Sequence, residues 1–172
     1  MKPVFLIGYM GSGKSTYGKL LADETGLAFV DADDYIVERS GCSIPELFAE
    51  KGESGFRRME RSCLEELCLR RDTIIATGGG MPCFGDNMAL MRRSGLTIYL
   101  ETPVSVLVER LAGTGGQRPL LRGKTSGELR QFVERALEER KPFYEQASCR
   151  VDSDCPDVVH LLAQLVRYAS QE

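Results

Sequence analysis

Short apolar runs alternate along this chain with longer segments of helical periodicity. The strand-like runs lie at residues 3–7 (PVFLI), 27–30 (LAFV), 73–77 (TIIAT) and 97–100 (TIYL), with a weaker one at 149–151. Each of the first four consists mainly of apolar or β-branched residues, as in strands that are buried on both faces. The pattern therefore predicts five short strands in the interior of the molecule.

Helical segments separate these strands. Apolar spacing and capping signals predict helices over residues 15–24, through Tyr35 to Arg39, from Ser43 in a short helix and from about 53 to 70 in a longer one, and over 104–111, 128–144 and 157–169. Gly26 and Gly41 are the expected stops of the first two, and Ser43 with Glu46 has the spacing of a capping box.

Strand–helix alternation of this kind predicts a parallel sheet with helices on both faces. We expect an α/β fold, a three-layer α/β/α sandwich around a five-stranded parallel sheet, with residues 1–172 forming a single domain. In such sheets ligands bind at the carboxyl ends of the strands. Residues 112–124 lack periodicity, and a loop of that length in a compact chain is typical of a functional lid.

Composition narrows the function. The 172 residues carry 22 Lys and Arg against 25 Asp and Glu, a net charge of −3, whereas proteins that neutralise nucleic-acid phosphates usually have a basic excess. No apolar run approaches the roughly 20 residues of a membrane helix. We therefore expect a cytoplasmic protein that binds neither nucleic acid nor membrane, and, without heptads or a long exposed apolar stripe, a monomer.

The cysteines and the histidine exclude further chemistry. None of the six cysteines forms a CxxC pair, and the only histidine is His160. The ligand spacing of a zinc site is therefore absent, and a Ser-His-Asp mechanism would lack its base, because His160 lies in an apolar helical run.

One motif points to a ligand. The segment GYMGSGKS at residues 8–15 fits the phosphate-loop pattern GxxxxGK[ST] between a predicted strand and a predicted helix. Glycines let the backbone aim successive N–H groups at a phosphate, and the helix N-terminus favours an anion there. Lys14 would bridge the β- and γ-phosphates, and the Ser15 hydroxyl would ligate Mg²⁺. The sequence therefore predicts a nucleoside triphosphate site.

Two classes of triphosphate user compete for this motif, phosphotransferases and nucleotide-gated switches or motors. A GTPase would need an NKxD segment, which is missing, and a DxxG directly after a strand, whereas the only DxxG lies at residues 23–26, at the end of a predicted helix. A motor would normally have an apolar strand ending in Asp-Glu. Here the strands end in DADD and TGGG, which favours a small-molecule kinase.

The acidic cluster after the second strand is a candidate acceptor site. Asp31 and Asp33 stand at i and i+2, where metal and acceptor must meet. One carboxylate could orient the water shell of the metal while the other accepts a hydrogen bond from the acceptor hydroxyl. The alternative is that the cluster caps the next helix, a role that suits Asp34.

Glycines and arginines add to this site. Gly78-Gly79-Gly80 ends the third strand, and three consecutive glycines are costly in entropy unless something approaches the backbone closely; the alternative is a loose loop. Arg57, Arg118 and Arg140 lie in separate segments, where each alone is more often a solvated arginine. Arg118 lies in the aperiodic loop, from which it could reach a transferring phosphate.

Together these segments resemble the shikimate kinase family of P-loop phosphotransferases over nearly the whole chain. The resemblance is carried by GYMGSGKST, FVDADDYIVERSG, SIPELFAEKGESGFRRME, ATGGGMP, RPLL and RKPFY, in the order of the family. Other P-loop kinases, of the gluconate or nucleotide kinase type, are the alternative.

The resemblance implies an activity and a role for each motif. The reaction would transfer the γ-phosphate of ATP to the 3-hydroxyl of shikimate, with Mg²⁺ as cofactor, in chorismate and aromatic amino acid biosynthesis. Lys14, Asp33 and Arg118 would be catalytic, and Asp31 would reach the metal through water. ATP would be bound by Gly11, Ser12, Gly13, Lys14, Ser15, Thr16, Arg110 and Arg118, with Arg110 stacked on adenine, and shikimate by Asp33, Arg57, Gly78, Gly79, Gly80 and Arg140, with residues 33–61 as its helical binding region.

Overall fold

The computed structural model describes residues 1–113, 123–155 and 157–169. The central feature is a five-stranded sheet in the order β2-β3-β1-β4-β5, in which all neighbours are parallel. The strands are β1 (Val4–Ile7), β2 (Ala28–Asp31), β3 (Thr73–Ala76), β4 (Leu96–Glu101) and β5 (Cys149–Asp152). The predicted α/β fold with a five-stranded parallel sheet is confirmed, and each strand begins or ends within one or two residues of the predicted run.

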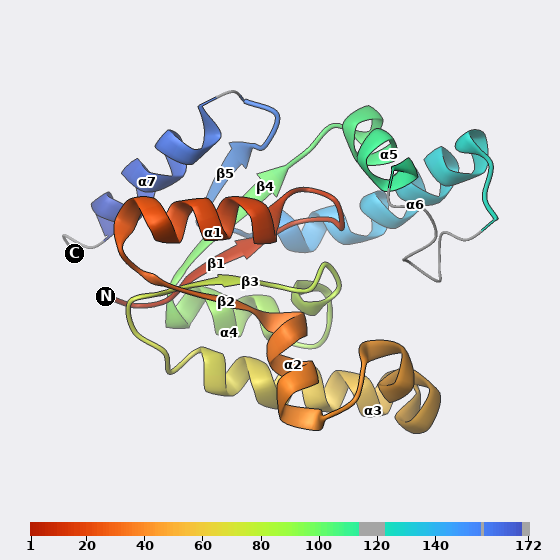
Figure 1. Cartoon of the computed structure of the whole chain (residues 1–172), viewed down its shortest axis with the longest axis horizontal. Helices are drawn as coiled ribbons and strands as arrows, with labels where there is room; N and C mark the ends of the chain where they lie inside the picture. Colours follow the sequence, from red (N-terminus) through yellow and green to blue (C-terminus); the bar gives the residue numbers. More distant parts are fainter. Residues whose placement is uncertain (114–122, 156, 170–172) are drawn as a thin grey trace.

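Helices connect the strands (Figure 1). They are α1 (Lys14–Thr25), α2 (Ala32–Ser40), α3 (Ile44–Leu67), α4 (Asn87–Ser94), α5 (Val104–Ala112), α6 (Ser126–Tyr144) and α7 (Val158–Ala169), with a 3₁₀ turn, η1 (Met81–Cys83). The predicted two-part helix is α3, which changes direction at Gly52, where φ is 64°. Neither η1 nor α4 was predicted from the sequence, because both elements are short and follow the glycine triplet.

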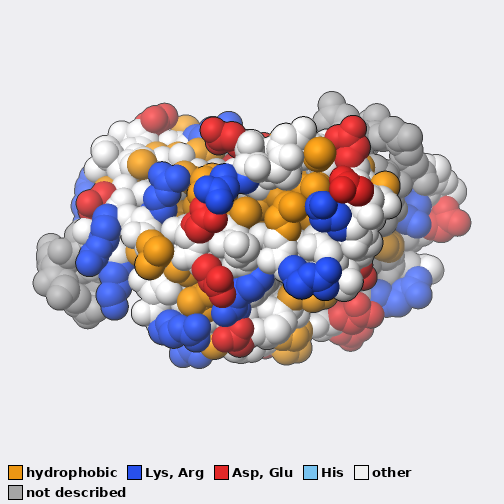
Figure 2. All heavy atoms as spheres, turned by 90° about the horizontal axis from the view of Figure 1, so that it is seen from below, with side chains coloured by type: hydrophobic (Ala, Val, Ile, Leu, Met, Phe, Trp, Pro, Cys, Tyr) orange, Lys and Arg blue, Asp and Glu red, His pale blue; other side chains and the backbone are white. Residues whose placement is uncertain are grey.

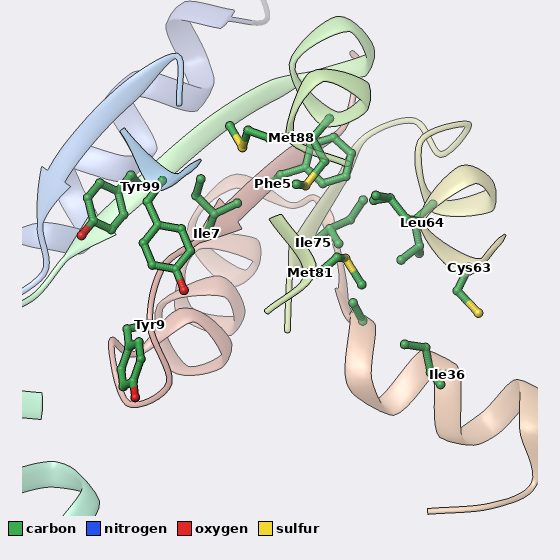
Figure 3. Close-up of a cluster of buried hydrophobic side chains, with 14 of the residues drawn as sticks. Phe5, Ile7, Tyr9, Ile36, Cys63, Leu64, Ile75, Met81, Met88 and Tyr99 are labelled. Carbon is green, nitrogen blue, oxygen red and sulfur yellow. The ribbon is translucent and has the colours of Figure 1, made fainter. Parts of the chain in front are cut away.

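The alternation of side chains along β1 divides the interior into two layers. Val4 and Leu6 pack with α1 and α7, which lie beside one another in Figure 1. Phe5 and Ile7 face the opposite layer, where side chains of α2, α3, α4 and α6 are buried. Figure 3 shows this second cluster, with Met81 of η1 beside Ile75 of β3. Because β1 is buried on both faces, its carboxyl end is fixed between two packed layers.

Candidate active site

The phosphate-loop segment runs directly from β1 into α1. Its glycines Gly8, Gly11 and Gly13 have φ of 147°, 83° and 92°, in the region that residues with a Cβ rarely adopt. Gly13 is the N-cap of α1, and a Cβ there would lie 2.6 Å from the Tyr17 ring. The loop therefore has the backbone conformation that the motif predicts, and it leads into the positive end of a helix.

Lys14 is held across this loop. Its ammonium donates to the carbonyl oxygens of Gly8 and Tyr9, each at 2.9 Å, and the residue is only 8% exposed. These bonds direct the charge back over the loop, where phosphate oxygens would lie when a nucleotide binds.

Ser15 and Asp31 meet although they come from different strand–helix junctions. The Ser15 hydroxyl donates to Asp31 Oδ2 at 2.5 Å. Asp31 Oδ1 also accepts from the Asp33 backbone N–H at 3.0 Å, so that Asp31 is the N-cap of α2. The helix cap is therefore Asp31, and the assignment of that role to Asp34 was wrong, since Asp34 lies in the first turn of α2.

The glycine triplet after β3 packs against three charged side chains. A Cβ on Gly78 would lie 2.6 Å from Asp33 Oδ1, one on Gly79 would lie 3.6 Å from a terminal nitrogen of Arg140, and one on Gly80 would lie 3.1 Å from both terminal nitrogens of Arg57. The predicted close approach to the backbone is thus made by side chains of α2, α3 and α6. The triplet gathers Asp33, Arg57 and Arg140 around one turn of backbone.

Arg57 pairs with carboxylates on the same face of α3. Its guanidinium donates to Glu60 Oε2 at 2.8 Å, three residues on, and lies 3.8 Å from Glu53. Glu60 is only 2% exposed. Burial raises the pKa of the Glu60 carboxyl, against the hydrogen bond and charge of Arg57, which lower it.

Arg140 and Tyr144 lie one turn apart on α6. The Arg140 guanidinium is 5.4 Å from the Tyr9 ring, and the Tyr144 hydroxyl donates to the carbonyl oxygen of Gly79 at 2.6 Å. Burial raises the pKa of Tyr144 far above its usual range, so the phenol keeps the proton that it donates. The helix α6 therefore carries Arg140 and also holds the glycine triplet, through the hydrogen bond of Tyr144.

A cleft of about 530 Å³ opens beside these groups. It is lined by Met10, Gly11, Gly13, Lys14, Ser15, Thr16, Tyr17, Asp31, Asp33, Thr77, Gly79 and Arg110. Arg110 donates to the carbonyl oxygen of Gly11 at 3.1 Å and lies 3.9 Å from Asp154, so it borders the phosphate loop. Arg118 and most of the expected lid lie outside the described residues.

Two residues of this site have no role in the sequence-based prediction. Glu60 stands three residues after Arg57, a spacing that could have indicated an ion pair on one helix face. Tyr144 belongs to the segment RKPFY, but no local pattern indicates that its hydroxyl reaches a strand end 65 residues earlier. Only the packing of α6 against η1 brings the Tyr144 hydroxyl to the glycine triplet.

A phosphate loop after the first strand, with carboxylates and arginines gathered at neighbouring strand ends, defines a P-loop phosphotransferase of the small-molecule kinase class. The family model for shikimate kinase matches residues 10–167. The chain therefore belongs to the shikimate kinase family, which is a family of ATP-dependent kinases.

Individual relatives agree. A shikimate kinase from Parabacteroides distasonis is 48% identical over 154 residues, which are 90% of this chain and 89% of that protein. The crystal structure of a shikimate kinase from Bacteroides thetaiotaomicron has a TM-score of 0.90 at 41% identity and covers 99% of both chains. A shikimate kinase from Acinetobacter baumannii in complex with shikimate has a TM-score of 0.86 at 31% identity, over 99% of this chain and 94% of that one.

A kinase of the gluconate type is less similar. A gluconokinase from Sinorhizobium meliloti has a TM-score of 0.61 at 21% identity, over 99% of this chain and 94% of that one, which shows a shared fold and no more. The gluconate-type alternative is therefore not favoured.

Proposed function

We propose that this protein transfers the γ-phosphate of ATP to the 3-hydroxyl of shikimate, giving shikimate 3-phosphate and ADP for chorismate biosynthesis. The observation that carries the proposal is the convergence of Asp33, Arg57 and Arg140 on the triplet, next to the phosphate loop. One carboxylate and two guanidinium groups suit an acceptor that carries both hydroxyls and a carboxylate. Membership of the shikimate kinase family supports the same acceptor.

The phosphate loop would hold ATP. Its N–H groups, from Gly11 to Thr16, and the Lys14 ammonium would bind the phosphates and neutralise charge that develops on the γ-phosphate. Arg110 would lie near the nucleotide, as its place in the cleft suggests. Arg118 would contact the transferring phosphate, as the resemblance implies.

The residues beside Lys14 fit Mg²⁺. The Ser15 hydroxyl and the Asp31 carboxylate place two hard oxygen donors 2.5 Å apart at the mouth of the phosphate loop, and Mg²⁺ prefers oxygen ligands with several retained waters. We propose that Ser15 would ligate the metal and Asp31 would bind it through water. When bound, the metal would supply positive charge to the β- and γ-phosphates.

The acceptor would be held between Asp33 and the two arginines. Arg57 and Arg140 would bind its carboxylate, a task that suits the planar fork of guanidinium. Asp33 would accept the hydrogen bond of the reacting hydroxyl and take its proton as the oxygen–phosphorus bond forms and the bond to ADP breaks. Most of the rate would come from positioning and charge neutralisation.

We also propose a cytoplasmic monomer that binds no nucleic acid. Figure 2, which views the molecule from below Figure 1, shows Lys and Arg interspersed with Asp and Glu on that face. Ion pairs also occur on the surface of the described residues, as between Arg39 and Glu66 and between Arg61 and Glu65, whereas a nucleic-acid footprint is a continuous basic stripe. Among the described helices, none has the length and apolarity to cross a membrane.

An ATPase-coupled assay tests the function, with shikimate, gluconate, AMP and CMP as acceptors. We expect ADP release to depend on shikimate. Release that gluconate or a nucleotide stimulated instead would refute the acceptor, and tight guanine-nucleotide binding with slow, acceptor-independent hydrolysis would indicate a switch.

A matched pair of variants tests the site. Asp33→Ala should nearly abolish turnover while ATP binding persists, whereas Asp34→Ala, which removes the same charge from the next position of α2, should leave turnover close to that of the wild type. Normal turnover of Asp33→Ala would contradict its assigned role.

A further inference from the structure

Arg57 is in close contact with an aromatic ring outside the motifs of the substrate site. Its guanidinium carbon lies 3.6 Å from the centroid of the Phe84 ring, compared with 5.2 Å for Phe56 and 6.0 Å for Phe48. Phe84 caps η1 in extended conformation, four residues after Gly80, and is half-buried. The segment that carries the glycine triplet therefore also supplies a ring to Arg57.

The ion pairs of the guanidinium engage its terminal nitrogens. Glu60 and Glu53 pair with them, and a Cβ on Gly80 would lie 3.1 Å from both. The buried Nε of Arg57 has no hydrogen-bond partner among the residues described. Ion pairs at the terminal nitrogens allow rotation about the side chain, whereas a ring in van der Waals contact restricts it.

The surroundings show where Arg57 could turn without this ring. Arg57 and Phe84 both line a second hollow, of about 770 Å³, whose walls include the carboxylates Glu53 and Asp86. Glu53 lies 3.8 Å from Arg57 in the present orientation. The hollow is therefore a space into which the guanidinium could turn further if the ring did not restrict it. Phe84 is the ring closest to Arg57 on the wall of this hollow.

We propose that Phe84 is a positioning residue for substrate binding, whose ring holds the Arg57 guanidinium in the orientation that receives the carboxylate of the acceptor. The inference rests on the proposed function, in which Arg57 binds that carboxylate. Phe84 acts through Arg57 and stabilises its charge by a cation–π contact. It therefore affects affinity for the acceptor and leaves the chemical step and the ATP site alone.

Steady-state kinetics of Phe84→Leu, which keeps apolar volume but removes the ring, test this role. We expect KM for shikimate to rise about 3- to 30-fold, the range of a cation–π contact, with kcat and KM for ATP unchanged. Phe84→Tyr restores the ring and should restore KM. Phe132→Leu, which removes a ring from α6 beside Lys124, is the matched control and should leave KM as in the wild type.

A double-mutant cycle separates this inference from the proposed function. If Phe84 acts through Arg57, adding Phe84→Leu to Arg57→Ala raises KM for shikimate no further than Arg57→Ala alone. An equal increase in both backgrounds, or none in the single variant, overturns the role of Phe84 while the Arg57 assignment stands. An unchanged KM in Arg57→Ala overturns both. Thermal unfolding checks that each variant is folded, and Phe84→Met replaces Phe84→Leu if that variant is not.

Discussion

The two glycine-rich loops of this site need glycine for different physical reasons. In the phosphate loop, Gly8, Gly11 and Gly13 have positive φ, so the conformation itself requires glycine. In the triplet Gly80 has φ of −87°, which any residue can adopt, and the requirement is for space beside Asp33, Arg140 and Arg57. In the proposed function, the first loop would receive phosphate through its backbone, and the second would admit the side chains that receive the acceptor.

The two loops also touch. A Cβ on Gly79 would lie 3.3 Å from the Met10 backbone nitrogen and 3.5 Å from the Gly8 carbonyl oxygen. Parallel pairing of β1 with β3 brings both loops to the same edge of the sheet. Backbone contact therefore fixes the two loops relative to one another, which suits the proposed reaction because it would depend on positioning.

Substitution in the phosphate loop should have the largest effect, and it should act on folding. Gly8 has φ of 147°, and a Cβ there would lie 2.8 Å from the Leu100 carbonyl oxygen. We expect Gly8→Ala to lower the free energy of unfolding by about 2–6 kcal/mol, from backbone strain and overpacking together. Urea unfolding measures the change.

The control for this prediction is Gly26→Ala. Gly26 also has positive φ, of 73°, but has nothing within 4 Å of its Cβ position, so only the strain remains, at about 1 kcal/mol. Equal losses in the two variants would show that crowding at Gly8 is unimportant.

Substitution in the triplet should instead reduce the rate with little change in stability. A Cβ on Gly78 would lie only 2.6 Å from Asp33 Oδ1 and would displace the Asp33 carboxylate. Asp33 lies at the exposed start of α2, where its side chain can move. We expect Gly78→Ala to lower kcat about 100-fold, as for a misplacement near 1 Å. Steady-state kinetics measure kcat, and titration calorimetry should show that the affinity for ATP is unchanged. A variant that fails to fold would instead assign to Gly78 the conformational role of Gly8.

Gly80→Ala should have a smaller effect, confined to substrate affinity. A Cβ there would lie 3.1 Å from the terminal nitrogens of Arg57, which can shift by a few tenths of an ångström because they end a flexible side chain. We expect KM for shikimate to rise about 3- to 10-fold, as for one weakened charge-assisted contact. Steady-state kinetics measure it, and a fall in kcat with constant KM would contradict the assignment of Arg57 to binding.

The contrast between the loops also explains what the sequence could predict. The phosphate loop is a local motif, and the strand, loop and helix around Lys14 form as expected. The glycine triplet indicated that some group approaches its backbone closely but did not indicate which one. The groups are side chains of α2, α3 and α6, and only the fold brings them together. Tyr144 and Phe84 were missed for the same reason, whereas Glu60 was missed although its spacing from Arg57 is local. The helix α4 was missed because it is only eight residues long, and Asp31 is the N-cap of α2 where Asp34 was expected.

The smallest effect concerns Glu60, the buried carboxylate that pairs with Arg57. Burial raises the pKa of Glu60 in the folded protein, and the charge of Asp33 adds to this, while Arg57 and Arg140 oppose it. The folded state therefore binds more protons than the unfolded chain between the unfolded pKa and the raised folded pKa. In that window the contribution of Glu60 to stability falls as pH rises.

Glu60→Gln keeps a hydrogen-bond acceptor for Arg57 and removes the titration. We expect the free energy of unfolding of the wild type, relative to this variant, to increase as pH falls from 7 toward the unfolded pKa of about 4.5. Urea unfolding at several pH values measures the difference. Glu65→Gln, which removes a carboxylate paired with Arg61 on the exposed face of α3, is the control and should show no such increase. A difference that decreased as pH fell would show that Arg57 lowers the pKa of Glu60 more than burial raises it.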